Sequence, residues 1–362
     1  MATAESSTIG TDTPSGSPTD QTQNTATAAP TTRPATAAPT TRPATAPQTA
    51  APTAPQTAAP TAPQTAAPTA PQTAAPTVAA SGAFPYVNFG ATYNNAYTGA
   101  AATASSADGK ASVSMSQAAN GVILARVDNV SAACKALVTT PAGSQFQYIL
   151  SPGKWLGVPC NGGSGSYTVM LLENVEGSTY LPLLNQAFSV SLGSALKPFT
   201  AASILTNFGS GSTAIQTANS LCAGVATTDG KVAAVYSWII SHITYNSALA
   251  SQISSGAVTT YIPDIEGIMS TRKGICFDYA ALMAAMLRSQ GVPTKLVMGT
   301  VPQGYHAWNE VYFQGTGWVV VSSFKVKQVS GSAYVMFDTT FGAGGMTIDG
   351  INAVSRTVQK TY

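Results

Sequence analysis

The first 82 residues of this 362-residue chain consist largely of short Thr-, Ala- and Pro-rich repeats. ATAAPTTRP occurs twice in tandem, at 26–34 and 35–43, and TAPQTAAP follows four times between residues 45 and 76. Such a segment has almost no large apolar side chains to bury, and its prolines disfavour both helix and sheet. We therefore expect residues 1–82 to be a disordered, partly polyproline-like linker, in which fifty residues at ~3.1 Å each reach roughly 150 Å.

Two interpretations of this linker are open. It can be a stalk, with threonines available for O-glycosylation, that holds the folded part away from a surface. It can equally be a repeat expansion without a role. A Pro/Thr/Ala stalk before β structure favours an extracellular or cell-surface location. Against that location, the opening MATAESSTIG has neither the basic nor the apolar region of a signal peptide.

Composition excludes several classes of protein. Charged residues are only 8% of the chain and the net charge is +2, whereas nucleic-acid binding requires clustered Lys and Arg, so we expect no nucleic-acid partner. No apolar run approaches the roughly 20 residues of a transmembrane helix, so we expect no membrane span. The four cysteines form no C-x-x-C pair and there are only two histidines, which argues against a zinc site. We expect no metal and no cofactor, and no D-x-D-x-D-G calcium loop is present.

Residues 83–193 are predicted to form a β-sandwich domain. Short apolar or alternating runs are separated by turn sequences such as TPAGS and NGGSGS, and strands at this spacing are typical of a sandwich. The segment contains no histidine and no catalytic constellation, so we expect a spacer or a substrate-docking module. Cys134 and Cys160 could form a disulfide if the protein is exported, although sequence does not fix the geometry. The predicted strands are 121–127, 134–140, 145–150, 166–175 and 184–192.

Residues 194–362 are predicted to form an α+β domain. Apolar residues at helical spacing in 231–243 indicate one helix, and the Ala/Leu/Met-rich run from Cys276 indicates another, which ends at Gly291 and Pro293. Consecutive strands are then predicted at 295–301, 306–313, 317–323 and 333–341. Helices followed by antiparallel strands define an α+β fold.

Three residues of this second domain have the types that thiol catalysis needs. Cys276 stands at the first turn of a helix, where the helix dipole stabilises a thiolate. His306 opens a strand after that helix and can exchange a proton with the thiol. Asp338 follows in the next strand region and can orient the imidazole. Each residue alone is weak evidence, but the three together predict a nucleophilic cysteine.

These residues lie in segments that resemble the core of the transglutaminase-like superfamily, which has a papain-like fold. KGICFDYAALMAAMLRSQGVPTKLVMG followed by HAWNEVYFQGTGW carries the resemblance, which runs through FDTTFGA and covers about residues 195–345. The resemblance implies that Cys276 is the nucleophile, His306 the base and Asp338 the orienting carboxylate.

The position of Asp338 departs from the family pattern in one respect. Many members of the family carry the aspartate directly after the G-x-W strand, where this chain has Ser322 and Ser323. Here the hairpin-like stretch FKVKQVSGSAYVM comes first. Bacterial relatives with such an insertion keep the D-x-T-F segment, which falls on Asp338.

The resemblance implies thiol-dependent acyl transfer on protein or peptide carboxamides. An amine acceptor gives crosslinking and water gives deamidation, while a cysteine peptidase of the same fold is the alternative. Cell-surface or cell-wall components are further candidate partners. A catalytically silent adhesin or scaffold is the alternative from another class, and the intact Cys, His and Asp set argues against it.

Four other residues bear on the predicted site. Tyr245 is a candidate oxyanion donor beside the Cys276 N–H, or a core tyrosine. Trp308 can shield the imidazole from water or simply pack. Asp278 suits the first turn of a helix and is not assigned a catalytic role, and His242, the other imidazole, is expected at the surface or in the core.

Overall fold

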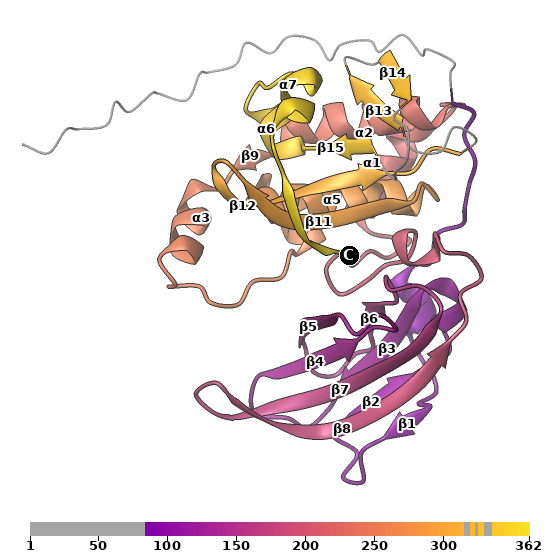
Figure 1. The fold of residues 1–362 in the computed structure, drawn as a ribbon, viewed down its shortest axis with the longest axis vertical. Helices are drawn as coiled ribbons and strands as arrows, with labels where there is room; N and C mark the ends of the chain where they lie inside the picture. Colours follow the sequence, from indigo (N-terminus) through magenta and orange to yellow (C-terminus); the bar gives the residue numbers. More distant parts are fainter. Residues whose placement is uncertain (1–83, 315–318, 323–324, 329–334) are drawn as a thin grey trace, which may run out of the picture. The chain divides into compact units, whose positions relative to one another are not determined.

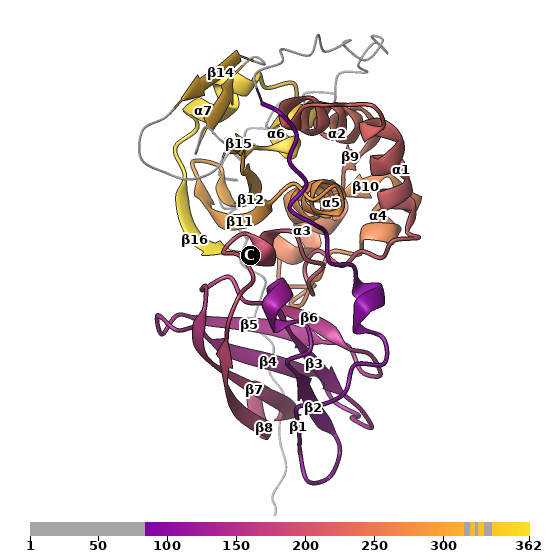
Figure 2. The ribbon, with the colours of Figure 1, turned by 90° about the vertical axis from the view of Figure 1, so that its right-hand side faces the viewer.

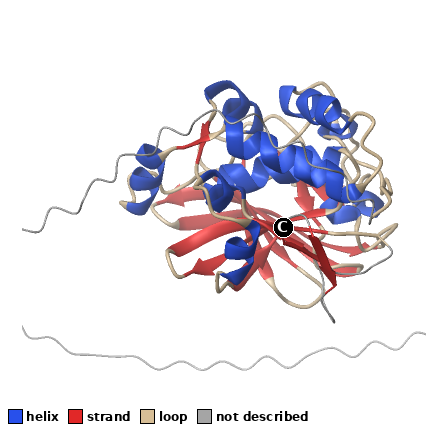
Figure 3. Ribbon diagram, turned by 90° about the horizontal axis from the view of Figure 1, so that it is seen from above, coloured by secondary structure: helices blue, strands red, loops and turns tan. Residues whose placement is uncertain are grey.

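The computed structural model describes residues 84–314, 319–322, 325–328 and 335–362. All of these belong to one compact unit of the chain. The linker predicted for residues 1–82 lies outside the described residues. Figure 1 shows a portion built mainly from strands and a portion that combines helices with strands, and Figure 3 distinguishes the two kinds of element by colour.

The all-β portion contains two four-stranded antiparallel sheets, with strand orders β1-β2-β3-β6 and β5-β4-β7-β8. Side chains alternate between buried and partly exposed along β4, as expected for a strand with one face in a core. All five predicted strands are present, and the structure adds β1, β2 and β6, which are too short to give a clear periodic signal. The strands are β1 (Ala104–Ser105), β2 (Ala111–Ser114), β3 (Val122–Val127), β4 (Cys134–Thr139), β5 (Gln145–Leu150), β6 (Leu156–Pro159), β7 (Gly165–Glu176) and β8 (Thr179–Val190).

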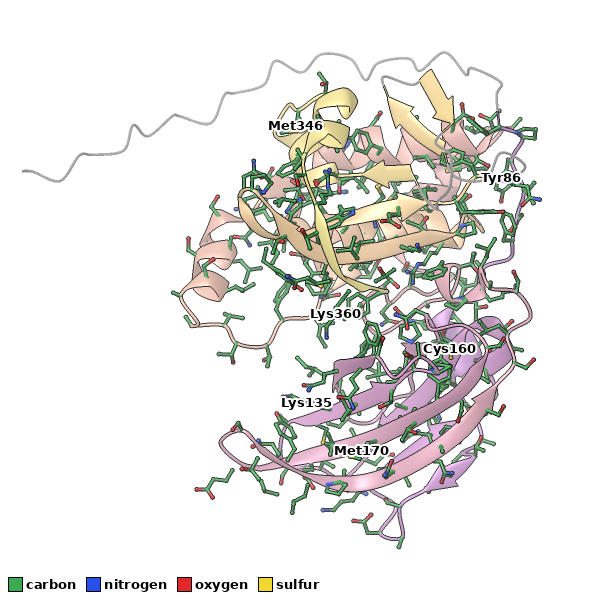
Figure 4. All side chains as sticks on the ribbon, in the orientation of Figure 1. Tyr86, Lys135, Cys160, Met170, Met346 and Lys360 are labelled. Atoms are coloured by element: carbon green, nitrogen blue, oxygen red, sulfur yellow. The ribbon has the colours of Figure 1, made fainter. Side chains whose placement is uncertain are left out.

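The cysteines of the sandwich are buried as free thiols. Cys134 lies on β4, and Cys160 follows β6 in the interior (Figure 4). The disulfide considered from the sequence is therefore not formed in this structure. Three short 3-10 helices complete this part and the connection that follows it: Asn94–Tyr97, Ala118–Asn120 and Lys197–Phe199.

The α+β portion is built around one helix, α5, which lies against an antiparallel sheet of order β15-β12-β11-β16. Figure 2 shows α5 nearly end-on between this sheet and the other helices. Every residue of α5 from Asp278 to Ser289 is buried, because its alanines let neighbouring elements approach from all sides. The helices are α1 (Thr213–Cys222), α2 (Thr228–His242), α3 (Ser247–Ser254), α4 (Ile265–Thr271), α5 (Cys276–Ser289), α6 (Thr339–Ala343) and α7 (Ile348–Ala353).

The strands of this portion follow the predicted order with one correction. The expected strand over 333–341 ends at Phe337, because Asp338 accepts a hydrogen bond from the Phe341 N–H and so caps helix α6. The stretch after Ser322 begins as a hairpin, in which β13 pairs with β14. The strands are β9 (Thr244–Tyr245), β10 (Lys273–Gly274), β11 (Thr294–Val301), β12 (Gly304–Val311), β13 (Val319–Ser322), β14 (Lys325–Gln328), β15 (Val335–Phe337) and β16 (Thr357–Thr361).

The first described residues contact the α+β portion rather than the sandwich strands. The Phe84 carbonyl accepts a hydrogen bond from the Thr228 N–H at 3.0 Å, and its ring lies edge-on to Phe313 at 5.0 Å. The Tyr86 hydroxyl (Figure 4) donates to the carbonyl of Gln290.

We propose that residues 83–193 and 194–362 are separate domains. A fragment of residues 195–362 that stayed unfolded on its own would contradict this division.

Candidate active site

The position of Cys276 follows from the start of helix α5. Ile275 is extended (φ −93°, ψ 179°) and Cys276 is the first helical residue. The Ile275 N–H donates to Asp278 Oδ2 at 2.8 Å, so the buried carboxylate satisfies a backbone group that the helix leaves free. Asp278 therefore has the structural role expected from its place in the first turn. Cys276 remains partly exposed at the positive end of the helix dipole.

Gly274, two residues before the cysteine, is required by close packing. A Cβ at this position would lie 2.6 Å from the Cβ of Asp278, which is closer than carbon atoms approach. Gly274 also pairs with Tyr245 in the parallel β9–β10 ladder. The glycine of the G-x-C segment thus lets the chain turn tightly into α5, and the ladder places β9 beside the helix start.

His306 lies on β12, and its two ring nitrogens have different partners. Nε2 is 2.7 Å from Asp338 Oδ2, and interaction with Cys276 raises the pKa of the imidazole, which indicates that the thiol lies near the ring. Because Nε2 faces the carboxylate, Nδ1 is the nitrogen available to the thiol. The ring of Phe341 stacks on the imidazole with centroids 4.6 Å apart. The structure therefore brings together the three residues predicted from the sequence.

The surroundings of His306 favour its protonated form. Burial alone lowers the pKa of the imidazole, but the hydrogen bond to Asp338 and the electrostatic interactions with Asp338 and Cys276 outweigh burial and raise the pKa to about 9. The site can therefore hold an imidazolium at neutral pH.

Asp338 is held by three groups and is completely buried. Its Oδ2 accepts from His306 and, at 3.4 Å, from Nη2 of Arg356. Its Oδ1 accepts from the Phe341 N–H at 3.0 Å. The carboxylate is thus fixed in position, which is what an orienting group for an imidazole requires.

Arg356 and Phe341 also belong to the site, and neither was predicted from the sequence. Arg356 lies beyond the segment that carries the family resemblance, and nothing in its local sequence marks it. Its guanidinium reaches Asp338 and also lies 5.6 Å from the ring centroid of Trp308. Phe341 belongs to the FDTTF segment, but its stacking on His306 depends on the turn of the chain at Asp338.

The two remaining candidates occupy different environments. Tyr245 is 43% exposed and is not a core residue. Burial of its hydroxyl and the nearby charge of Cys276 raise its pKa, so its phenol lies near the thiol, and its role as an oxyanion donor stays a prediction. Trp308 is fully buried with its ring centroid 6.4 Å from that of His306. Its indole Nε1 has no hydrogen-bond partner among the described residues.

His242 lies at the surface and takes no part in this site. It ends helix α2 with its ring stacked on Trp238 at 4.6 Å, and Nδ1 lies 2.8 Å from the Trp238 carbonyl. In the part of the chain that the structure describes, no group of three or more His, Cys, Asp or Glu side chains is placed to hold a metal ion. No helix among the same residues is long and apolar enough to cross a membrane.

Residues 215–323 match the family model of the transglutaminase-like superfamily. This part of the chain is a transglutaminase-like domain, which confirms the resemblance found in the sequence. The matched residues include Cys276 and His306, whereas Asp338 lies beyond them. No curated protein matches the chain in sequence.

Several solved structures are similar to the chain. A candidate cysteine protease from Cytophaga hutchinsonii is 14% identical, with 64% of this chain and 84% of that chain covered and a TM-score of 0.31. The periplasmic domain of TgpA from Pseudomonas aeruginosa is 15% identical over 61% of this chain and 86% of that one, with a TM-score of 0.26. A TGase is 17% identical, with 36% of this chain and 43% of that chain covered and a TM-score of 0.23. Similarities this low assign neither a reaction nor a substrate to the chain.

Proposed function

We propose that the chain is a thiol-dependent acyltransferase that acts on protein or peptide carboxamides through Cys276, His306 and Asp338. The observation that carries the proposal is the arrangement of His306 between Asp338, whose Oδ2 lies 2.7 Å from Nε2, and the thiol at the start of α5, which raises the pKa of the imidazole. A nucleophile, a proton partner and an orienting carboxylate are the groups that covalent acyl transfer requires.

The proposed reaction has two steps. The Cys276 thiolate attacks the carboxamide carbon, and the departing ammonia takes a proton from the His306 imidazolium, which leaves a thioester. A tetrahedral oxyanion forms before the thioester. The Cys276 N–H stabilises this oxyanion, and Tyr245 is the candidate second donor. An amine or a water molecule then gives up a proton to His306, attacks the thioester and releases the thiolate.

The acceptor in the second step decides between crosslinking and deamidation. A cysteine peptidase would use the same groups on a backbone amide, and a scaffold protein would use none of them. Incubation with a Gln-containing protein and a labelled primary amine separates these functions by mass spectrometry. Amine incorporation or conversion of Gln to Glu supports the proposal, whereas peptide fragments support the peptidase. No product from any substrate would favour the scaffold.

Selective alkylation tests whether the thiol is activated. We expect iodoacetamide to label Cys276 in the folded protein at rates that persist below about pH 8, because the helix start and His306 favour its thiolate. The other three cysteines are internal controls, since they are buried. Burial raises the pKa of Cys160 to about 12 and that of Cys222 to about 11, and it also raises the pKa of Cys134. The His306→Ala variant should label more slowly at Cys276, and equal labelling of all four thiols would contradict an activated cysteine.

The pH dependence of activity should show how the Asp338 carboxylate affects the pKa of His306. The pKa of His306 is raised to about 9 from an ordinary value of 6.5, so the imidazolium and its contribution to stability are complete below about pH 6.5 and are lost as the pH rises through about 9. In the Asp338→Asn variant we expect the alkaline limb of kcat/KM to move down by about 1–2 pH units, because the negative charge is removed. An unshifted limb would show that Asp338 does not act on His306.

We also propose that the protein works on the extracellular side or at the cell surface. The Pro/Thr/Ala-rich repeats of residues 26–76 support this location. Fractionation of the native source tests it, and recovery of the protein only from the cytosol would overturn it.

A further inference from the structure

The repeats of the N-terminal segment present a regular series of glutamines. Each of the four TAPQTAAP units carries one glutamine between a proline and a threonine. These four residues are Gln48, Gln56, Gln64 and Gln72. We propose that they are acyl-donor substrates of Cys276 in this same protein, an inference that rests on the acyl transfer proposed above. The chain would then carry both the enzyme and the carboxamides on which it acts.

The composition of the repeats suits a carboxamide substrate. A proline precedes each glutamine, and the sequence between residues 45 and 76 contains no charged side chain. Such a composition is typical of segments that polyproline-binding surfaces recognise. Two glutamines of the folded part have partners of their own: Gln290 donates to Asn219 at 2.7 Å, and Gln216 donates to the Gly211 carbonyl at 3.2 Å.

Two exposed tyrosines flank the reactive thiol and can receive the prolines of the repeats. Tyr245 and Tyr305 are 43% and 57% exposed, among the most exposed large apolar side chains of the described residues. Tyr245 pairs with Gly274, two residues before Cys276, and Tyr305 lies on β12. Burial and then the charge of Cys276 raise the pKa of both hydroxyls, which indicates that both rings lie near the thiol. Aromatic rings at a protein surface bind polyproline-like segments by packing against proline rings. The neutral repeats also bring no charge that such contacts would have to desolvate.

The repeats are tethered to the domain that holds the cysteine. Phe84, the first described residue, hydrogen bonds to Thr228 and packs on Phe313. About a dozen residues separate it from Gln72, which is roughly 37 Å of extended chain. A tether of this length raises the effective concentration of the nearest glutamine to the millimolar range for any site within its reach. Reaction within one molecule would then give a rate constant independent of protein concentration.

Each transfer replaces one amide bond by another. The Sγ–Cδ thioester forms as the Cδ–Nε2 bond of the glutamine breaks, and ammonia leaves with a proton from His306. A primary amine then forms the new Cδ–N bond, the Sγ–Cδ bond breaks, and the proton of the amine passes to His306. Residues 1–83 contain no lysine, so the amine must come from the folded part, from another molecule or from a free amine. Water in place of the amine would convert each glutamine to glutamate.

The test is the full-length protein incubated with a fluorescent primary amine and, in the same tube, a short unrelated glutamine peptide. Peptide mapping by mass spectrometry should find the label, or conversion to glutamate, on the four repeat glutamines. Gln21 and Gln23 are matched controls in the same N-terminal segment, because they lie outside the repeats. A variant with all four repeat glutamines replaced by asparagine should lose the modification and still modify the added peptide.

The outcomes separate this inference from the proposed function. Modification of the repeat glutamines at least tenfold above Gln21 and Gln23 supports the inference. Modification of the added peptide alone, or of all glutamines equally, overturns it while the acyltransferase function stands. No modification of any glutamine in the protein or the peptide overturns both.

A second measurement tests the tyrosines as specificity determinants. The substrate is the two-repeat peptide TAPQTAAPTAPQTAAP, compared with the same peptide in which every proline is replaced by serine. We expect the proline peptide to have a kcat/KM at least about fivefold higher, through KM, in the wild-type protein. In the Tyr305→Ala variant this preference should disappear. An undiminished preference would exclude Tyr305 from recognition of the repeats.

Discussion

Replacement of Cys276 by alanine is expected to reduce acyl transfer by at least about ten-thousand-fold, because covalent catalysis cannot proceed without its nucleophile. His306→Ala should have a similar effect, since the imidazole both activates the thiol and protonates the leaving ammonia. Asp338→Ala should reduce turnover less, because both reacting groups remain. Initial rates of labelled-amine incorporation into a glutamine peptide measure all three variants.

The control for these variants is a thiol that has no place in the site. Cys222 is buried at the end of α1, and Cys222→Ala should keep wild-type turnover even if it costs some stability. Cys276→Ala should keep the melting temperature of the wild type, since Cys276 is only partly buried. Equal products from Cys276→Ala and wild type would show that the nucleophile has been assigned to the wrong residue.

The variants of Asp338 need a stability measurement as well as an activity measurement. The carboxylate caps α6 and lies beside the guanidinium of Arg356, so alanine removes a helix cap and leaves a buried cation without this partner. Asparagine keeps an oxygen for the Phe341 N–H, but its amide NH2 group replaces the oxygen that accepts from His306 and Arg356. The difference between Asp338→Ala and Asp338→Asn therefore separates the support of the fold from the orientation of His306.

The sequence predicted the main elements because their signals are local. The run from Cys276 has strong helix formers and ends at Gly291, and the structure ends α5 at Ser289. The strands over 295–301 and 306–313 are found within a residue or two as β11 and β12. The prediction failed at 333–341, where Thr339, Thr340 and Phe341 have high β propensity. There the side chain of Asp338 bonds to the backbone and starts a helix.

The site was predictable only in part, for a related reason. Cys276, His306 and Asp338 lie in recognisable motifs and carry reactive groups, so residue type and order suggested them. Arg356 and Phe341 act through contacts that no local pattern encodes. Arg356 reaches Asp338 only because β16, which follows it, returns to pair with β11. Arg356 also lies beyond the segment that resembles the transglutaminase-like superfamily, so the resemblance did not point to it. Tyr305 likewise appears as an ordinary strand residue until its exposure is known.

Contacts between segments that are far apart in the sequence also predict that Arg288 is one of the most important residues for stability. It is completely buried in the last turn of α5, where its charge also suits the helix dipole. Its guanidinium donates to Thr294 O at 2.8 Å, to Ala201 O at 3.1 Å, to Thr206 Oγ1 at 2.7 Å and to the main-chain oxygen of Tyr362 at 2.9 Å. One side chain thus links α5 to three separate parts of the chain.

We expect Arg288→Met to lower the free energy of unfolding by about 3–5 kcal/mol, because methionine fills similar space but leaves several buried oxygens without donors. Urea denaturation followed by circular dichroism measures the change. Arg126→Met is the matched control: its ion pair with Asp128 is partly exposed, with side-chain exposures of 37% and 28%, and its loss should cost less than about 1 kcal/mol. A similar small loss for both variants would mean that the buried hydrogen bonds of Arg288 only offset the cost of burying its charge. The fold would then depend on the apolar packing of α5 alone.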